Sequence, residues 1–159
     1  MKLSATLAAV LALTAAGQAA ALSCLRPDPE TTFDQVAALP EPWFVLRGVL
    51  TFDPALLPEN DLSNSEQSYA PIPAQFRGKG LTRQGFTADY ISPVTLQVEC
   101  AGPWCGSAES GLDALYFVRA DPEGATVVAS PCGEFVFPDP SEEVLARMVA
   151  CLNAGTCGG

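Results

Sequence analysis

Short apolar runs and one strictly alternating segment dominate the hydrophobic pattern of this chain. Residues Val94–Cys100 (V-T-L-Q-V-E-C) alternate apolar and polar positions, which predicts a strand whose apolar side chains and Cys100 face the core. Residues Trp43–Phe52 are aromatic, β-branched and almost uncharged, which is typical of a strand. Residues Ile72–Thr82 form a third predicted strand, and its two glycines favour a strong bend or a bulge.

Two further strands are predicted around a turn. Residues Leu112–Ala120 and Ala125–Ser130 are largely apolar, and the tetrapeptide Asp-Pro-Glu-Gly between them has the composition of a hairpin turn. Residues Asp53–Pro71 differ, because prolines, Asn, Asp and Ser outnumber the residues that pack in a core. This segment is predicted to be a long surface loop.

Helical spacing occurs on both sides of the predicted strands. Residues Thr31–Leu39 place apolar positions at helical spacing behind Thr31, the predicted N-cap. A second helix is predicted to begin at Asp139 as its cap, with Pro140 in the first turn, and to run through Leu152. The chain is thus predicted to be mainly β: a five-stranded OB-type barrel with a short N-terminal helix and a C-terminal helix. A sandwich usually needs about seven strands.

The beginning of the chain has the layout of a cleavable secretory signal. Lys2 precedes an uncharged apolar run that is shorter than the roughly 20 residues needed to span a bilayer. Ala19 and Ala21 then supply an A-x-A cleavage site. We therefore expect a signal peptide at residues 1–21 and one mature domain at residues 22–159.

The cleavage register decides which residue begins the mature chain. Cleavage after Ala21 leaves Leu22 first, whereas the alternative signal, residues 1–23, leaves Cys24 first. A lipid-anchored Cys24 is disfavoured, because Ala21 stands where such signals usually carry Leu. We expect an exported protein, periplasmic or extracellular and of bacterial type, with no membrane association after signal cleavage.

Charge and composition exclude several classes of function. The formal net charge is −10, which argues against nucleic acid and anionic membrane surfaces as partners. The sequence contains no histidine. This excludes Ser-His-Asp and Cys-His catalysis and zinc sites built on histidine. No cofactor is predicted.

The cysteines indicate disulfide bonds. Six cysteines in an exported chain predict three disulfides among fifteen possible pairings. The alternative is a metal site, which the segment C-A-G-P-W-C at residues Cys100–Cys105 approaches most closely. Its spacing is loose for zinc and no matching cysteine pair follows, so no metal site is predicted.

Several short motifs carry a resemblance to a known family. They are Cys24, F-V-L-R-G-V-L at Phe44–Leu50, F-R-G-K-G at Phe76–Gly80, W-C-G-S at Trp104–Ser107 and S-P-C-G at Ser130–Gly133. In this order they resemble the netrin-like, OB-fold family that includes the tissue inhibitors of metalloproteinases. The match covers most of the mature chain.

The resemblance bears on the disulfide pairing. The animal inhibitors begin with Cys-x-Cys, whereas this chain has only Cys24 at that place, so at least one family bridge is missing. If Cys100 pairs with Cys105, the remaining cysteines form a long-range bridge and a local bridge. The expected set is Cys24–Cys132, Cys100–Cys105 and Cys151–Cys157. A Cys24–Cys105 bridge is the competing pairing.

The resemblance also implies one specific mechanism. In the metalloproteinase inhibitors, the amine and carbonyl of an N-terminal cysteine chelate the catalytic zinc of the target protease. Cys24 would present these two donors only if signal cleavage occurs after Ser23. If the mature chain begins at Leu22, the two extra residues block this geometry.

Five residues are candidates for binding. Arg77, Lys79 and Arg83 concentrate three basic residues within seven positions, and Arg47 is expected on the neighbouring strand. On an OB barrel such a face often binds an extended anionic ligand. The alternative is that these cations pair with the many carboxylates of the chain. Trp104 is either an exposed aromatic anchor or a ring packed over a disulfide.

The expected function is that of an exported, disulfide-stabilised OB-fold module that binds an unknown protein or small ligand and performs no catalysis. The first alternative is a metalloprotease inhibitor that acts through Cys24. The second is a hydrolase that uses two carboxylates about 5 to 10 Å apart. The sequence contains 18 acidic residues, so some such pair is expected in any case, and no catalytic residue is predicted.

Overall fold

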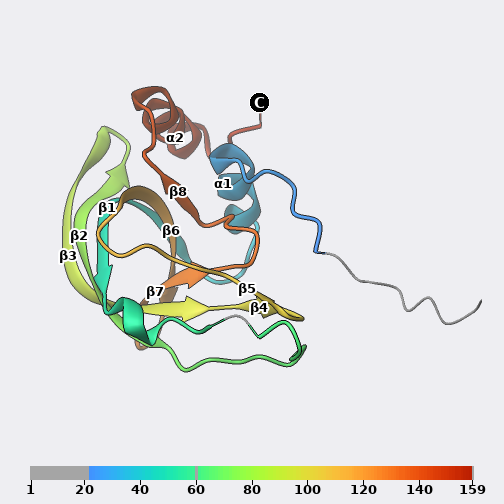
Figure 1. Ribbon diagram of the computed structural model, residues 1–159. Coiled ribbons are helices and arrows are strands. Elements are labelled where there is room, and N and C mark those ends of the chain that lie inside the picture. Colours follow the sequence, from blue (N-terminus) through green and yellow to red (C-terminus); the bar gives the residue numbers. More distant parts are fainter. Residues whose placement is uncertain (1–21, 60, 159) are drawn as a thin grey trace, which may run out of the picture.

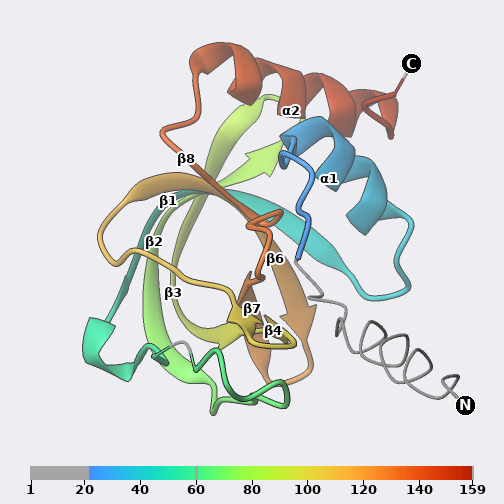
Figure 2. The ribbon, with the colours of Figure 1, turned by 45° about the vertical axis from the view of Figure 1, so that its right-hand side comes forward.

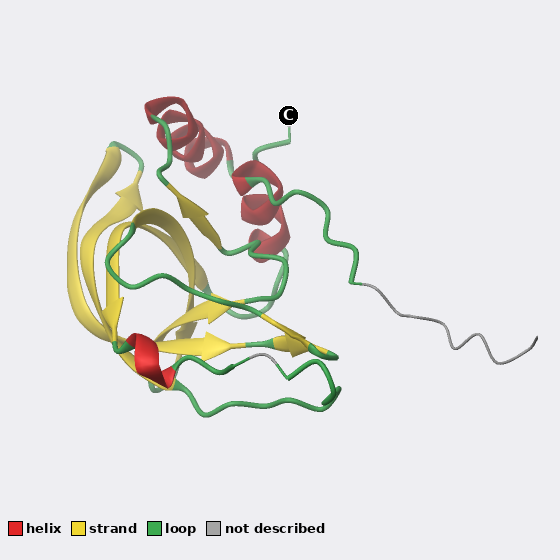
Figure 3. Ribbon diagram, viewed as in Figure 1, coloured by secondary structure: helices red, strands yellow, loops and turns green. Residues whose placement is uncertain are grey.

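The protein is mainly β, with one α-helix near each end of the described chain (Figure 1, Figure 3). The computed structural model describes residues 22–59 and 61–158, and the predicted signal peptide at residues 1–21 lies outside them. In chain order the elements are α1 (Pro29–Ala37), β1 (Trp43–Phe52), a 3₁₀ turn η1 (Pro54–Leu56), β2 (Ile72–Thr82), β3 (Gly85–Val98), β4 (Cys100–Ala101), β5 (Trp104–Cys105), β6 (Asp113–Asp121), β7 (Gly124–Ala129), β8 (Val136–Pro138) and α2 (Glu142–Ala154).

Five of the strands are each paired on both sides. β1 is antiparallel to β2 and β2 to β3, while β3 is parallel to β7. β7 is antiparallel to β6, and β6 is antiparallel to β1, so the pairings return to the first strand. The short β8 adds to β6 opposite residues 114–116. β4 and β5 form a separate two-stranded ribbon.

The main hydrophobic core lies on the inner side of these five strands. In β1 the side chains of Leu46, Leu50 and Phe52 point inward, as period-2 alternation requires. Phe76 of β2 and Tyr116 of β6 meet there edge to face, with ring centroids 5.2 Å apart. Burial raises the pKa of Tyr116 to about 12. Its hydroxyl donates a hydrogen bond to the carbonyl of Leu112 at 3.2 Å.

A second core fills the space between the two helices and the outer side of β1 and β6. Leu115 and Phe117 of β6 face the helices, where Met148 of α2 is fully buried. Because β6 is covered on both sides, residues 114–118 are all buried. This explains why the segment A-L-Y-F-V is continuously apolar instead of alternating.

Both helices begin at caps other than the predicted ones. The carboxylate of Asp28 accepts a hydrogen bond from the Thr31 amide at 2.8 Å, so Asp28 rather than Thr31 caps α1. Ser141 caps α2, whereas the predicted cap Asp139 precedes the helix with a φ of 46°. Gly155 ends α2 in the left-handed conformation. Within the described residues, no helix is long and apolar enough to cross a membrane.

The strand predictions were correct for the apolar segments and missed the polar ones. β1 and β2 have the predicted bounds, and the register of β2 shifts between Gly80 and Leu81, as expected for a bulged strand. β3 begins at Gly85, nine residues before the predicted start, because residues 85–93 are mostly exposed and do not alternate. Cys100 belongs to β4 and is partly exposed instead of facing the core.

Three disulfide bonds connect distant and local parts of the chain. Cys24–Cys132 joins the segment before α1 to the loop after β7, across a sequence separation of 108. Cys100–Cys105 closes the β4–β5 ribbon, and Cys151–Cys157 ties the end of α2 to the residues that follow it. The competing Cys24–Cys105 pair is not formed, and the described residues hold no free cysteine. Such bonds indicate an oxidising, exported environment.

Candidate functional site

The helices leave the outer face of β1, β2 and β3 open beyond their contacts at one end of the sheet. In Figures 1 and 2, α1 and α2 lie together at one end of the sheet, close to β8 and to the β2–β3 turn. Their apolar contacts reach Val45, Leu81 and Phe86, all at that end. We call the outward-facing positions of residues 47–51, 73–79 and 89–95 the open face.

Three of the four predicted basic residues lie together on the open face. Arg47 stands opposite Lys79, and Lys79 stands opposite Asp89, so these three side chains form one row across the strands. Arg77 occupies the next row, between Val49 and Ile91. The alternation of side chains along each strand therefore places the three cations on the same side of the sheet.

Carboxylates pair two of these cations. A guanidinium nitrogen of Arg47 lies 3.3 Å from Glu142 at the start of α2, and another lies 3.7 Å from Asp113. The ammonium of Lys79 lies 2.5 Å from Asp89. Arg77 is exposed and has no ion pair within the part of the chain that the structure describes. The open face is thus mixed in charge rather than strongly basic.

An exposed apolar side chain accompanies Arg77. Ile91 is 66% exposed although it lies in the middle of β3, directly opposite Arg77 in the β2–β3 register. Apolar residues and Arg are enriched in the centres of protein–protein interfaces. Arg77 and Ile91 therefore give the middle of the open face the composition of a protein–protein interface centre. The sequence did not indicate this role for Ile91.

The other two predicted residues lie elsewhere. Arg83 is in the β2–β3 turn, and its carbonyl accepts a hydrogen bond from Asn153 of α2 at 3.1 Å. Trp104 is in the β4–β5 ribbon, at the opposite end of the molecule from that turn in both views (Figure 1, Figure 2). Its ring is partly buried and lies against Gly102. Neither residue joins the open face.

Among the described residues, three carboxyl groups have pKa values lowered from the usual value, each with a structural cause. Hydrogen bonds from the Cys157 and Gly158 amides hold the pKa of Asp34 below its usual value. A hydrogen bond from Ser63 lowers the pKa of Asp61 in the same way, and one from Arg119 lowers that of Asp121. A glycosidase acid needs a raised pKa. The pKa values of Asp34, Asp61 and Asp121 are lowered, not raised, and the hydrogen bonds that lower them hold turns and the C-terminal segment in place.

The remaining predicted features concern metals and Cys24. Residues 22–59 and 61–158 contain no group of three or more His, Cys, Asp or Glu side chains placed to hold a metal ion. Cys24 is exposed, lies outside any helix or strand, and is fixed to the body of the protein through Cys132. Only the cleavage register determines whether its amine is free.

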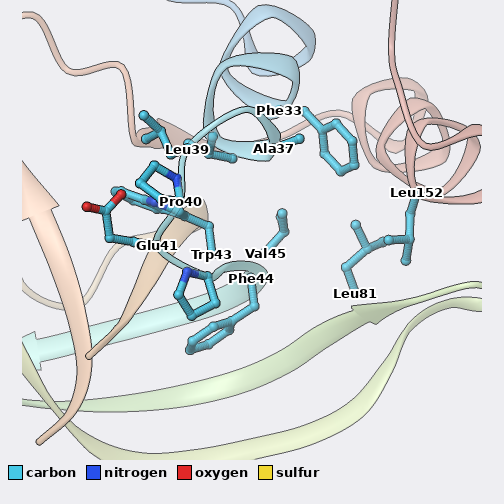
Figure 4. Close-up of a pocket in the computed structure, with 12 residues that line it drawn as sticks. Phe33, Ala37, Leu39, Pro40, Glu41, Trp43, Phe44, Val45, Leu81 and Leu152 are labelled. Atoms are coloured by element: carbon cyan, nitrogen blue, oxygen red, sulfur yellow. The ribbon is translucent and has the colours of Figure 1, made fainter. Parts of the chain in front are cut away.

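An apolar pocket beside α1 was not predicted from the sequence. It has a volume of about 400 Å³ and lies between the end of α1, the turn at residues 38–42, the start of β1, Leu81 and Leu152 (Figure 4). Trp43, at the border of the pocket, is partly buried and stacks on Phe135 at a centroid distance of 5.0 Å. Its indole nitrogen is buried and has no hydrogen-bond partner among the described residues.

Comparison with known proteins identifies no relative: no protein-family model, no curated protein and no solved structure matches this chain.

Proposed function

We propose that this protein is an exported, non-catalytic binding module built on a closed five-stranded barrel of the OB type. The circuit of pairings β1–β2–β3–β7–β6–β1 supports closure. The spatial order β6–β1–β2–β3 is the order of a Greek key, as in OB barrels. The three disulfides and the predicted signal peptide support export to the periplasm of a bacterium or to the extracellular space.

The open face is the proposed binding surface. One observation carries this proposal: Ile91 is 66% exposed beside Arg77, on a sheet face that the described helices leave uncovered. OB barrels commonly bind ligands across their second and third strands, here β2 and β3. The partner class that fits is a protein surface with an apolar centre and a carboxylate for Arg77. With a formal net charge of −10, nucleic acid is not a suitable partner.

The binding proposal is tested by crosslinking. We expect a photo-reactive residue at position 91 to crosslink a partner protein in the exported fraction. The same group at position 35, on the exposed side of α1, should not. With that partner purified, Ile91→Asp should weaken its Kd about 30-fold, the effect of losing an interface hot spot of about 2 kcal/mol.

A matched control separates binding from a general effect of charge. Leu62, in the loop between β1 and β2, is 72% exposed, and Leu62→Asp introduces the same charge away from the open face. Its Kd for the partner should stay within about twofold of the unmodified protein, as for surface changes remote from an interface. If Ile91→Asp and Leu62→Asp weaken partner binding equally, or if neither weakens it, the open face is not the binding surface.

Inhibition of a metalloprotease through Cys24 is a second candidate. The observation in its favour is that Cys24 is exposed and fixed by a disulfide, which would present an N-terminal amine and carbonyl rigidly. The proposal requires Cys24 to be the first residue. The zinc chelation by the Cys24 amine and carbonyl is taken from the resemblance to the metalloproteinase inhibitors.

Two forms of the mature protein test this candidate. A chain that begins at Cys24 should inhibit a zinc endopeptidase, and a chain that begins at Leu22 should not, because two added residues displace the chelating amine. Acetylation of the Cys24 amine should abolish inhibition. Mass spectrometry of the exported protein shows which form is natural, and we expect Leu22 first. If neither form inhibits, the candidate is excluded.

A further inference from the structure

Most of β3 is paired with another strand on one side only. Residues 85–96 of β3 pair with β2, whereas the pairing with β7 is confined to residues 95–98. Within the described chain, no further backbone hydrogen bond joins residues 86–93 to another segment. In Figure 1 this half of β3 lies at the left margin of the ribbon, beside β2. We call the side of residues 88–93 that points away from β2 the free edge.

The backbone groups of Asp89 and Ile91 point toward the free edge. Along an antiparallel strand, residues alternate between those that bond to the partner strand and those that point away from it. The amide of Glu99 donates a hydrogen bond to the carbonyl of Ala129 at 2.9 Å, so the odd-numbered residues face the β7 side. The β2–β3 register is continuous over residues 88–96, so this alternation carries back to Ile91 and Asp89.

The free edge is exposed and carries an apolar side chain. Ile91 is 66% exposed, and Asp89 is exposed beside it. Ala88 is exposed as well, although the alternation places it on the same side of the strand as the buried Val94. Proteins usually protect such an edge with charged side chains, prolines or a covering segment. Pro93 limits the free edge at one end, but Ile91 leaves its middle apolar and open.

An extended chain is the structure that binds to a strand edge. In an antiparallel addition, Ile91 and Asp89 would each exchange two backbone hydrogen bonds with the residue opposite. The side chains on the outer face then select the segment, because cross-strand neighbours favour apolar pairs and opposite charges. An apolar, β-branched residue suits the position opposite Ile91. A cation suits the position opposite Asp89, whose carboxylate already attracts Lys79 from the other side.

A second copy of this chain does not suit the free edge. If Ile91 of the two copies were opposite each other, Asp89 would face Pro93, which has no amide hydrogen to donate. A shift of two residues would place Ile91 opposite a carboxylate, and a further shift would place two Asp89 carboxylates opposite each other, which destabilises a sheet. The formal net charge of −10 adds repulsion between copies. The free edge therefore favours a segment of a different protein.

We propose that the partner of the open face adds an extended segment to the free edge of β3. The segment is antiparallel to β3, with an apolar, β-branched residue opposite Ile91 and a Lys or Arg opposite Asp89. This inference rests on the proposed function, because it assigns a conformation and a residue pattern to the part of the partner that contacts Ile91.

Hydrogen exchange of the unbound protein tests the free edge itself. The amides of Tyr90 and Ser92 bond to β2, whereas those of Asp89 and Ile91 point away from it. We expect the Asp89 and Ile91 amides to exchange with deuterium at least about tenfold faster than their two neighbours, as measured by NMR. Equal protection of all four amides would show that the edge is covered and would overturn the inference.

The peptide acetyl-T-V-Y-K-T-amide is the probe for strand addition. Its valine is designed to lie opposite Ile91 and its lysine opposite Asp89. We expect it to shift the Asp89 and Ile91 amide signals saturably in an NMR titration. N-methylation of its valine and lysine removes the donors that face β3 and should weaken binding at least about tenfold. N-methylation of its tyrosine and second threonine, which point away, is the matched control and should leave the affinity within about twofold.

Two substitutions at one position separate the backbone from the side chain. Asp89→Pro and Asp89→Ala both remove the carboxylate, but only Asp89→Pro also removes the amide hydrogen at the free edge. Proline is tolerated at such edge positions. We expect Asp89→Pro to bind the peptide at least about fivefold more weakly than Asp89→Ala. Should Asp89→Pro not fold, the two N-methylated peptides still decide whether the backbone is used.

The outcomes distinguish this inference from the proposed function. Equal binding of the two N-methylated peptides, or no binding of the unmodified one, would overturn strand addition. Asp89 and Ile91 signals that shift with protein concentration alone would identify a second copy as the occupant and would also overturn it. The proposed function is tested separately by crosslinking at position 91. A partner that loses affinity in Ile91→Asp but binds Asp89→Pro and Asp89→Ala equally would leave the open face in place and exclude strand addition.

Discussion

Replacing Cys24 and Cys132 by serine is expected to lower the free energy of unfolding by about 4 to 5 kcal/mol. The bond spans a sequence separation of 108, and closing a loop of about 100 residues removes entropy from the unfolded chain worth about 4.7 kcal/mol in the chain-entropy model. Domains of this size have total stabilities of only about 5 to 15 kcal/mol.

The folded state should survive this change, because α1 has other attachments. Thr32 donates a hydrogen bond to the carbonyl of Glu134 at 2.8 Å, and Arg147 of α2 pairs with Glu30. Asp34 accepts hydrogen bonds from the Cys157 and Gly158 amides. The expected loss therefore arises mainly in the unfolded state.

Urea denaturation of the double-serine variants provides the measurement. The Cys100–Cys105 bond has a sequence separation of only 5, so removing it should cost about 2 kcal/mol in the same model. The comparison between the two variants is informative because both remove two cysteines. If both lose the same amount, loop length does not determine the effect, and the long-range bond is less important than its span suggests.

Gly78→Ala is expected to lower the free energy of unfolding by about 3 kcal/mol or more. Gly78 stands directly opposite Gly48, where β1 and β2 approach closely. A Cβ atom at Gly78 would lie 2.1 Å from the carbonyl oxygen of Arg47 and 2.8 Å from the Cα of Gly48. Both are backbone atoms, so relief of the clash requires the strands to move apart.

Gly80→Ala, two residues along the same strand, is the matched control. A Cβ atom there would meet Ala88 and Leu46 at 3.6 Å, which is ordinary van der Waals contact. We expect Gly80→Ala to change the stability by less than about 1 kcal/mol in thermal or urea unfolding. Similar losses in the two variants would mean that strand propensity, rather than the close approach of β1 and β2, is responsible.

The prediction of individual strands depended on burial. β1 and β2 were predicted with their observed bounds, because each is apolar or alternating along its whole length and is followed by turn residues. The first half of β3 was missed for the opposite reason. Within residues 85–93 only a few side chains, such as Tyr90, pack against a core, and most of the others are exposed. The sequence of this segment therefore shows no regular apolar–polar alternation.

The helix caps show a related difference. Asp28 and Asp139 both stand before a predicted helix and have equally suitable side chains. Asp28 caps α1, whereas Asp139 adopts a positive φ and leaves Ser141 to cap α2. β8 packs against β6 just before that point, and the turn out of β8 sets where α2 can begin. Local sequence does not contain this constraint.

The candidate site was predictable only in part. Alternation along the strands was enough to place Arg47 and Lys79 near each other, but their partners Glu142 and Asp89 come from α2 and from the unpredicted part of β3. The apolar pocket was not predictable, because its walls come from both helices, the start of β1 and the end of β2.

The sequence by itself determined that this protein is mainly β, that a helix lies near each end, that its cysteines form disulfides, and that histidine chemistry is excluded. These properties depend on local periodicity and on composition, which are present in any stretch of the chain. Only the tertiary structure decided which carboxylates pair the basic residues, that Ile91 stays exposed beside Arg77, and that Trp43 borders a cavity. These depend on contacts between segments that are distant in the sequence, which strand pairing and helix packing create and no local pattern encodes.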